Sequence, residues 1–415
     1  MLLLPDILLA QNNNFIVDAL VSPKKQERVI TVGKMNSDIQ GYTNEAIQVA
    51  VDALPSEGGT VKLSEGLFKI KAPVRLRSNT RLIGSGPETI LKRIDGFHSR
   101  FILDADYGEL KVTVEDPSGF EVGMSIQITT KSNASCWDVS TGIITDKVDN
   151  IIYFDTPLIR DYDCEDDGIA SNTGSCISVM NAQNVFISGF SIDGNKMKND
   201  HLDGCNGGGI VIGRSKYITV EKVNVKEVNG EGITWQITEN VTVRNCEISG
   251  CSNMGLHPGT GSPNTLIEGN NSHDNRVGLF ICWRVQHSQV INNQFHNNTE
   301  CGISTGHKDS DVTFKDNHIY ENGEDGVYFR NEDAKNSPHR NIFINNIVEN
   351  NGILKGGYGF CFNGQAQDVS LEDNVIRDNK NGTQKAAIFI SKGTPPPKEK
   401  NNKMSGHKLG NIVNG

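Results

Sequence analysis

Short apolar segments recur along the second half of the chain at a nearly constant spacing. Each begins with a glycine and continues with alternating apolar and polar positions, and successive glycines are separated by 23, 23, 23, 24, 24 and 33 residues. These glycines are Gly209, Gly232, Gly255, Gly278, Gly302, Gly326 and Gly359. Alternation with a period of two is typical of β-strands, and a fixed long period is typical of stacked repeats. The pattern therefore predicts a parallel β-helix with about 23–24 residues per coil.

Asparagines recur between these strands in two columns. Identical slots of stacked coils lie about 4.8 Å apart, so side-chain amides in one column can bond to each other inside the core. The first column is Asn270, Asn293, Asn317, Asn346 and Asn374, and the second is Asn275, Asn298, Asn322, Asn351 and Asn379. Cys246 and Cys251 occupy the same two slots one coil earlier.

The rest of the chain fits around this solenoid. Residues 1–14 are predicted to be a secretory signal segment, although the basic start of such signals is missing, and residues 15–415 to form the β-helix domain. Residues 43–54 read as an amphipathic helix with Thr43 as its N-cap. Residues from about 100 to 170 break the period and predict a β insertion, and an irregular tail is expected from about residue 393.

The helix and the segments after it, Gly58–Leu63 and Asn79–Gly86, resemble the N-terminal cap and first coils of pectate-lyase-like proteins. The resemblance implies an all-β, single-stranded right-handed parallel β-helix with an N-terminal capping helix. It also implies a polysaccharide or oligosaccharide substrate.

Composition narrows the function further. The net charge of −10 argues against nucleic acid as a partner, because binding to phosphates needs a basic surface. No stretch has the roughly 20 apolar residues of a membrane span. The nine cysteines form no CxxC motif and are expected to be buried thiols. A signal segment and a glycan substrate together predict a secreted or periplasmic protein.

Alternation within the repeated strands predicts one outward-facing patch. Counted from each glycine, positions +1 and +3 are apolar and +2 and +4 should face outward. The patch and its corners contain His257, Trp283, Arg284, His307, Lys308, Asp309, Tyr328, Arg330, Asn331 and Glu332. Gly259 and Gly306 are expected to leave a groove floor open to a sugar. His339 and Arg340, in a longer loop, are expected to lean over the patch.

The residue types of the patch suit β-elimination or C5 epimerisation of a uronic acid. Both reactions remove the proton next to a carboxylate, so they need a cation to neutralise that carboxylate, together with a base and an acid. Lys308, His257 or Tyr328 could be the base, Arg330 or Tyr328 the acid, and Arg284 the neutralising cation. Trp283 and His307 would contact the sugar.

The strand Gly326–Arg330 resembles the strand that carries the catalytic arginine in the alginate lyase and chondroitinase B family of β-helix lyases. In that family a catalytic lysine lies one coil earlier, so the resemblance implies catalytic roles for Arg330 and Lys308. This sequence has Gly306 where the strand-borne lysine would lie, and Asn331-Glu332 where the family has His-Gly.

Two alternatives stay open. Asp309 and Glu332 lie 23 residues apart, close to one coil, and could be the carboxyl pair of a glycoside hydrolase. A non-catalytic carbohydrate-binding β-helix would use the same patch without titrating groups of perturbed pKa. No metal ligand is assigned, although the acidic run at residues 161–167 could bind Ca²⁺ through its oxygens or be a solvated loop.

Overall fold

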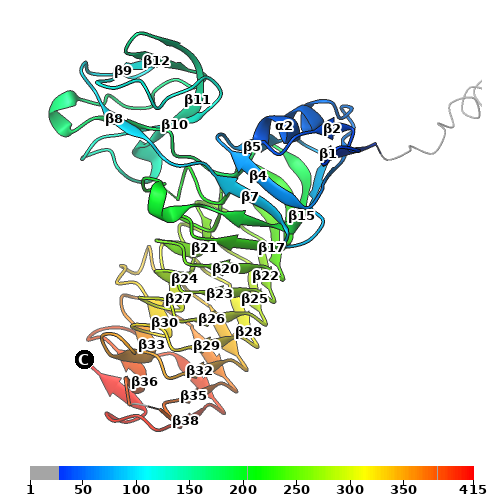
Figure 1. Cartoon of the computed structure of the whole chain (residues 1–415). Coiled ribbons are helices and arrows are strands. Elements are labelled where there is room, and N and C mark those ends of the chain that lie inside the picture. The colour runs from blue at the N-terminus through cyan, green and yellow to red at the C-terminus, as the bar shows by residue number, and fades with distance from the viewer. Residues whose placement is uncertain (1–27, 203, 381) are drawn as a thin grey trace, which may run out of the picture.

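The computed structural model describes residues 28–202, 204–380 and 382–415, so the candidate signal segment at residues 1–14 lies outside the described residues. The chain winds into stacked coils, with a short helix at the N-terminal end and an additional small sheet beside the first coils (Figure 1). Nearly all strand pairs along the stack are parallel, which confirms the predicted parallel β-helix.

The strands of the described residues form three sheets. Sheet A has 22 strands, which are β1 (Val29–Gly33), β2 (Ile39–Gln40), β3 (Gly59–Leu63), β4 (Gly66–Ile70), β6 (Thr80–Ile83), β7 (Thr89–Arg93), β15 (Gln183–Asp193), β17 (Lys216–Lys226), β19 (Glu239–Arg244), β20 (Glu247–Ser249), β22 (Leu266–Glu268), β23 (Asn271–His273), β25 (Gln289–Ile291), β26 (Gln294–His296), β28 (Thr313–Lys315), β29 (His318–Tyr320), β31 (Ile342–Ile344), β32 (Ile347–Glu349), β34 (Ser370–Glu372), β35 (Val375–Arg377), β37 (Lys398–Lys400) and β38 (Lys403–Ser405). Sheet B has 11 strands, which are β5 (Val74–Leu76), β14 (Ile177–Met180), β16 (Ile210–Gly213), β18 (Ile233–Gln236), β21 (Met254–Gly259), β24 (Val277–Phe280), β27 (Ile303–Thr305), β30 (Val327–Phe329), β33 (Gly357–Phe362), β36 (Gln384–Ile390) and β39 (Ile412–Asn414). Sheet C has six strands, which are β8 (His98–Arg100), β9 (Lys111–Thr113), β10 (Ser125–Thr129), β11 (Ser140–Val148), β12 (Ile151–Phe154) and β13 (Ile169–Ser171).

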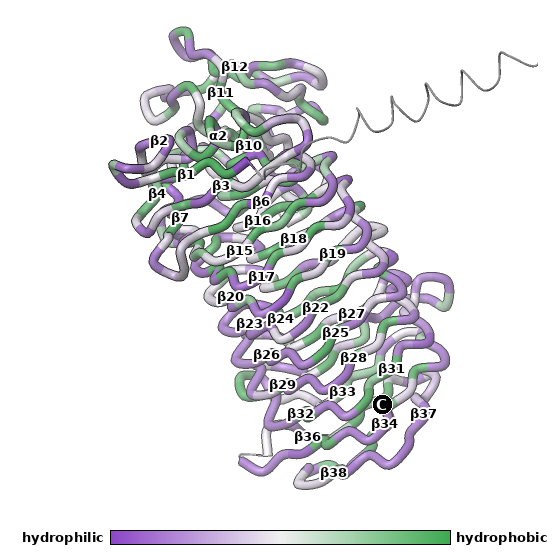
Figure 2. The backbone as a smooth tube through the Cα atoms, turned by 90° about the vertical axis from the view of Figure 1, so that its right-hand side faces the viewer, coloured by the Kyte–Doolittle hydropathy of each residue, from purple (hydrophilic) through white to green (hydrophobic). Residues whose placement is uncertain are grey.

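The repeat places equivalent residues above one another. In sheet B, Ile233 pairs with Leu256, and Leu256 pairs with Leu279, and all three side chains are fully buried. Figure 2 shows apolar and polar stretches alternating along the coils. The apolar columns form one continuous core along the solenoid, as expected where no single coil can bury its own apolar face.

Two columns of buried amides run through this core. In the first, each Nδ2 donates to the next Oδ1, for example from Asn293 to Asn317 at 2.9 Å, and the column continues to Asn402. In the second, Asn351 Nδ2 donates to Gln384 Oε1 at 2.9 Å, so Gln384 takes the slot that the sequence assigned to Asn379. Asn379 is exposed because the chain turns outward before β36, and the expectation for Asn379 was wrong.

A helix closes the N-terminal end. Helix α2 (Asn44–Asp52) begins after Thr43, whose hydroxyl accepts a hydrogen bond from Ala46 N at 3.3 Å, as the capping pattern predicts. Ile47, Ala50 and Val51 pack onto the first coils. Three short 3₁₀ helices lie at Cys136–Asp138, Cys164–Asp166 and Lys196–Lys198. In the described part of the chain, no helix is long and apolar enough to cross a membrane.

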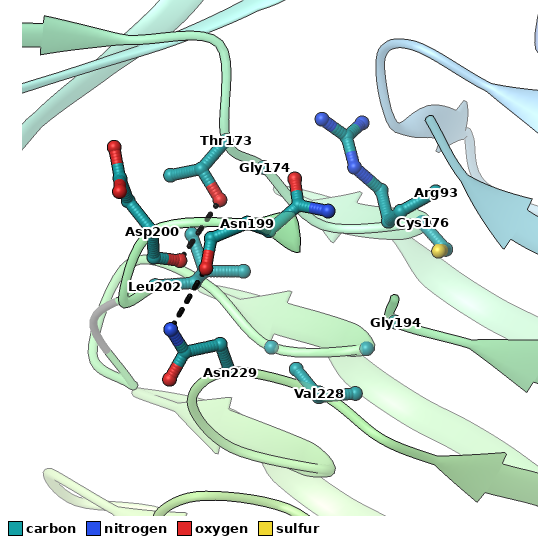
Figure 3. Close-up of a pocket in the computed structure, with 12 residues that line it drawn as sticks. Arg93, Thr173, Gly174, Cys176, Gly194, Asn199, Asp200, Leu202, Val228 and Asn229 are labelled. Carbon is teal, nitrogen blue, oxygen red and sulfur yellow. Dashed lines mark hydrogen bonds between the residues drawn. The ribbon is translucent and has the colours of Figure 1, made fainter. Parts of the chain in front are cut away.

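Sheet C is antiparallel and has its own small core around Phe120, Ile152 and Tyr162. At its junction with the first coils lies Arg93, which is 3% exposed and donates through Nη2 to Asn172 O at 2.7 Å. Beside Arg93 is a small cavity of about 10 Å³, with room for about one water molecule, that Asn199, Asp200 and other residues line (Figure 3). Burial without a carboxylate partner lowers the pKa of Arg93 to about 10.

The expected irregular tail is a further coil. Strands β37, β38 and β39 pair in parallel with β34, β35 and β36. The prolines at residues 395–397 precede β37 instead of interrupting it, at a position where a missing N–H costs no ladder hydrogen bond. Asn402 then continues the first amide column.

Candidate functional site

The candidate site lies on the outer face of sheet B. The register aligns Thr234, His257, Phe280, Ser304 and Tyr328 one coil apart, and it aligns Gly306 with Arg330 in the neighbouring outward column. The solenoid thus brings side chains from four successive strands, β21, β24, β27 and β30, onto one surface. We call the group formed by Cys282, Trp283, His307, Arg330 and Glu332 the sheet B cluster.

Much of this surface is less exposed than alternation alone predicts. His257 is 6% exposed and lies 3.6 Å, Nδ1 to Oε2, from the buried Glu231. The spaces above the two glycines are filled rather than open. A Cβ on Gly259 would lie 2.3 Å from Gln236 Oε1, and one on Gly306 would lie 2.6 Å from Arg330 Nε. The expected open groove floor at these glycines was therefore wrong.

Arg330 lies flat across the outer face. Its Nη1 donates to Ser304 Oγ at 2.8 Å, and its Nη2 donates to the carbonyl of Ile281 at 2.6 Å. The guanidinium carbon lies 4.3 Å from the ring centroid of Phe280, a cation–π geometry. Only glycine at position 306 leaves room for this arrangement. Arg330 is thus a cation fixed in place by neighbouring coils.

Asp309 lies beneath Arg330 and is fully buried. Its Oδ1 accepts from Val285 N at 3.0 Å, its Oδ2 accepts from Gly306 N at 3.2 Å, and Arg330 Nη2 is 3.4 Å from Oδ2. Burial raises the pKa of Asp309 to about 7, against the opposing effects of Arg330 and the two N–H donors. This carboxyl group holds the turn and the arginine, and it has no surface toward a substrate.

His307 links three members of the sheet B cluster. Its Nε2 lies 2.8 Å from Glu332 Oε1, and its Nδ1 lies 3.2 Å from Cys282 Sγ and 3.4 Å from Arg330 Nη2. Trp283 stacks on the ring with centroids 4.7 Å apart and is itself 49% exposed. Burial and then Arg330 lower the pKa of His307, and Glu332 raises it, with a net shift downward. The imidazole is therefore neutral near pH 7.

Two chain corners carry these residues in unusual backbone conformations. Trp283 and Arg284 have φ of 62° and 65°, and His307 and Lys308, one coil later, have φ of 48° and 69°. Left-handed backbone recurs at other corners of the solenoid, for example at Tyr217 and Ile237, but at these two corners two successive bulky residues adopt it. The Arg284 N–H donates to the His307 carbonyl at 2.9 Å, so the two corners are stacked on each other.

The other predicted residues lie around the cluster. Lys308 is half-buried and held through its N–H, which donates to Asn336 O at 2.6 Å, and Asn331 is exposed. His339 Nε2 bonds to Ala334 O at 2.8 Å within its own loop. Arg340 forms two 2.7 Å hydrogen bonds to Asp311. His339 and Arg340 thus stabilise the loop at 331–341, and the structure does not bring them to the cluster.

Sequence reasoning missed one outward column, the position before each glycine. A Cβ on Gly232 would lie 2.3 Å from Ile248, so this position faces the core, and the next residue, Ile233, is also buried. Because two consecutive positions face inward, the residue before the glycine faces outward. This slot holds Glu231 beside His257 and Asp325 near Tyr328. Burial raises the pKa of Asp325 to about 6 and also raises the pKa of Tyr328.

The acidic run at 161–167 uses its carboxylates within sheet C. Asp166 accepts from Ser132 N at 2.9 Å, and Asp167 pairs with Arg100 at 2.9 Å and Lys131 at 3.1 Å. Among the residues that the structure describes, no three His, Cys, Asp or Glu side chains come together as metal ligands.

Comparison with known proteins places the chain among right-handed parallel β-helix proteins, since a family model described as "Right handed beta helix region" matches residues 193–343. A second model, "Rhamnogalacturonase A/epimerase, pectate lyase-like", matches residues 31–257, which is more than half of the chain. The chain belongs to this family, as its resemblance to pectate-lyase-like proteins implied. No curated protein matches the sequence.

Solved structures show the same fold at low identity. The A-module of mannuronan C-5 epimerase AlgE4 from Azotobacter vinelandii is 16% identical with a TM-score of 0.53, covering 89% of this chain and 93% of that one. The AlgE6 A-module from the same organism is 14% identical with a TM-score of 0.51, covering 89% and 95%. PfbA, a surface adhesin of Streptococcus pneumoniae, is 15% identical with a TM-score of 0.53, covering 89% and 87%. At these identities the likeness concerns the fold.

Proposed function

We propose that this protein acts on a uronate-containing polysaccharide at the outer face of sheet B, by β-elimination or C5 epimerisation. The observation that carries the proposal is Arg330, a cation held flat on that face by Ser304 and Ile281, directly after the strand β30 that carries Tyr328. A fixed cation that receives the substrate carboxylate makes the neighbouring C5 proton more acidic, which both reactions require.

The remaining roles follow from position and protonation. Tyr328 is half-buried and its raised pKa keeps the phenol protonated at neutral pH, which suits the acid that protonates the leaving oxygen or the sugar carbon. Lys308, at the edge of the same surface, is our choice for the base, and His257 is the alternative. Trp283 offers its exposed ring for stacking on a sugar. The epimerase modules with the same fold act on mannuronan by their names, which supports a uronate substrate.

Glycoside hydrolysis is supported less well. It would need Asp309 and Glu332 to face the scissile bond. Asp309 is fully buried under Arg330, and Glu332 binds His307 at 2.8 Å. Asp309 therefore cannot contact a sugar oxygen, and Glu332 is engaged by His307.

Proton exchange at C5 tests the proposal, because elimination and epimerisation share that step. The full-length protein is incubated in deuterated buffer with alginate, pectate, glycosaminoglycans and ulvan, and deuterium at C5 is followed by NMR with ultraviolet absorbance of unsaturated uronate in parallel. We expect activity on at least one polyuronate, with a loss of at least about 100-fold in Arg330→Ala and Tyr328→Phe. Arg340→Ala and Tyr320→Phe, which lie away from the cluster, are the matched controls and should retain activity.

Other results would redirect the proposal. Reducing ends without deuterium or absorbance would reject proton abstraction in favour of hydrolysis. Saturable binding of a polyuronate without any turnover would indicate a carbohydrate-binding protein, a result that the fold shared with the adhesin makes informative.

A further inference from the structure

The sheet B cluster contains a cysteine that the uronate chemistry does not use. Cys282 Sγ lies 3.2 Å from His307 Nδ1, and His307 Nε2 lies 2.8 Å from Glu332 Oε1. A nucleophile within hydrogen-bond reach of a base, with the base oriented by a third group, is the signature of nucleophilic catalysis. Three separate segments contribute, namely the residues that directly follow β24, β27 and β30.

The contact with Glu332 fixes the tautomer of the His307 imidazole. A carboxylate accepts hydrogen bonds, so the 2.8 Å contact places the ring proton on Nε2, toward Glu332. The lone pair of His307 is then on Nδ1, which faces the thiol of Cys282. The neutral ring, whose pKa is lowered by burial and by Arg330, can accept the thiol proton near pH 7.

Arg330 places a positive charge next to His307 and Cys282. Its Nη2 is 3.4 Å from the same Nδ1, which brings a guanidinium beside the sulfur, and a nearby cation stabilises a thiolate. The same cation can stabilise the oxyanion that forms when a carbonyl is attacked. Trp283, stacked over His307 and half exposed, covers one side of the imidazole and offers a surface to the substrate.

Several other cysteines in the described part of the chain lie where the thiolate is disfavoured. Burial raises the pKa of Cys176, Cys246 and Cys251 to about 12. Cys164, in the 3₁₀ helix next to sheet C, is more exposed than Cys282, but its pKa is raised by burial and by Asp104. A partly exposed thiol beside a carboxylate is therefore available in the same chain as an internal control.

We propose that Cys282, His307 and Glu332 form a thiol–imidazole–carboxylate triad that hydrolyses carboxylic esters, such as an acetyl group on a sugar hydroxyl. Cys282 loses its proton to His307 Nδ1 and attacks the ester carbonyl. The C–O bond then breaks, the sugar alcohol takes the proton from His307, and an acyl-thioester remains on Cys282. Water, deprotonated by His307, attacks the thioester, which releases the carboxylic acid and restores the thiol.

The sugar part of this substrate rests on the proposed function, but the thiol chemistry does not. A small ester without a sugar therefore tests the triad on its own. If the protein hydrolyses esters but does not turn over uronates, only the proposed glycan substrate is rejected. If it turns over uronates but does not hydrolyse esters, only the proposed triad is rejected.

The first experiment measures the reactivity of the thiol. The full chain is alkylated with iodoacetamide over a range of pH, and peptide mass spectrometry reports the rate at each cysteine. We expect Cys282 to react at least about 10-fold faster than Cys164 at neutral pH. In Glu332→Gln the pH profile of Cys282 should move to higher pH, because the imidazole is no longer oriented. A Cys282 that reacts no faster than Cys164, or whose profile ignores Glu332→Gln, overturns the proposal.

The second experiment measures turnover. Wild type, Cys282→Ala, His307→Gln and the control Cys164→Ala are assayed with p-nitrophenyl acetate and with acetylated alginate, pectin and xylan, with acetate release as readout. We expect loss of at least about 100-fold in the first two variants and no loss in the control. Equal rates in Cys282→Ala and wild type, with unchanged thermal unfolding, would overturn the activity.

Discussion

At the scale of single residues, Asp309 illustrates how a chemically suggestive side chain can serve the structure instead. Its two oxygens accept the N–H groups of Val285 and Gly306, and its ionised form offsets the charge of Arg330. Removing one partner of a buried charged pair leaves the other uncompensated, which costs far more than the pair itself contributes. Asp311 offers a comparison, because it pairs with Arg340 at the surface.

We therefore predict that Asp309→Ala lowers the free energy of unfolding by about 3–5 kcal/mol. Asp311→Ala should lower it by about 1 kcal/mol or less, because exposed ion pairs contribute little. Denaturant unfolding of the two variants against wild type measures both values. Similar small losses in both would mean that Arg330 finds another partner when Asp309 is absent.

His296, on the outer face of sheet A, has a pKa well below that of free histidine. His296 stacks between His273 and Tyr320 at 4.7 Å and 4.6 Å. Burial, His273 and His318 lower its pKa to about 4, against the opposing charges of Asp274 and Glu247. In the unfolded chain this imidazole takes up its proton near the ordinary histidine pKa of 6.5, whereas in the folded protein it does so only near pH 4.

Folding should thus lose stability as pH falls from about 6.5 to about 4, and this contribution should be fully present above 6.5. Because the ring is only half-buried, solvent screening limits the loss to about 1–2 kcal/mol. We expect His296→Phe, which keeps the stacked ring but cannot be protonated, to flatten this part of the pH profile. Thermal unfolding midpoints of both proteins across this range measure the difference. Parallel profiles would exclude His296 as the cause.

At the scale of elements, the amide columns hold the coils in register. Each internal asparagine bonds to the coils on both sides, and Asn293 alone makes bonds to Asn317, Ile267 and Asn270. A substitution there leaves several buried polar groups without partners. Asn379, which the repeat would place in a column, is exposed and provides the contrast.

We predict that Asn293→Ala lowers the free energy of unfolding by at least about 2 kcal/mol. Asn379→Ala should change it by no more than about 0.5 kcal/mol, as for most surface positions. Denaturant unfolding monitored by circular dichroism compares the two variants. A large effect of Asn379→Ala would place this residue inside the second column after all.

The repeat made these elements predictable, because a single spacing of 23–24 residues sets the positions of the strands, the apolar core columns and the amide columns. The failures arose where the chain departs locally from the repeat. Gln384 takes the place expected for Asn379 because the turn before β36 contains additional residues. Glu231 and Asp325 face outward because two inward-facing positions follow one another at each glycine. The direction of the Arg330 side chain, back over Gly306, depends on contacts between coils that no single segment encodes.

At the scale of the whole molecule, the added sheet C must be held against the solenoid. Gln127 Nε2 donates to His201 O at 2.8 Å, and Asn206 Nδ2 donates to Val139 O at 3.2 Å. The loop between β15 and β16 thus contacts the insertion and leads directly into sheet B, which carries the sheet B cluster further along. Arg93 lies in the same junction beside the cavity of Figure 3.

Arg93 brings a buried charge into this junction without an acidic partner, and its Nε and Nη1 have no hydrogen-bond partner among the described residues. Asn172 O, which accepts from Arg93, also accepts from Ser125 Oγ at 2.8 Å and would keep that bond without the arginine. An apolar side chain of similar length should therefore be tolerated, since it removes the desolvation cost of the charge. We predict that Arg93→Met is neutral or stabilising by about 1 kcal/mol, whereas Arg93→Ala loses about 3 kcal/mol or more through the enlarged cavity. Thermal unfolding and limited proteolysis of the insertion distinguish the two variants. A large loss in Arg93→Met would mean instead that the charge is neutralised by an anion in the cavity, and stability should then depend on the anion in the buffer.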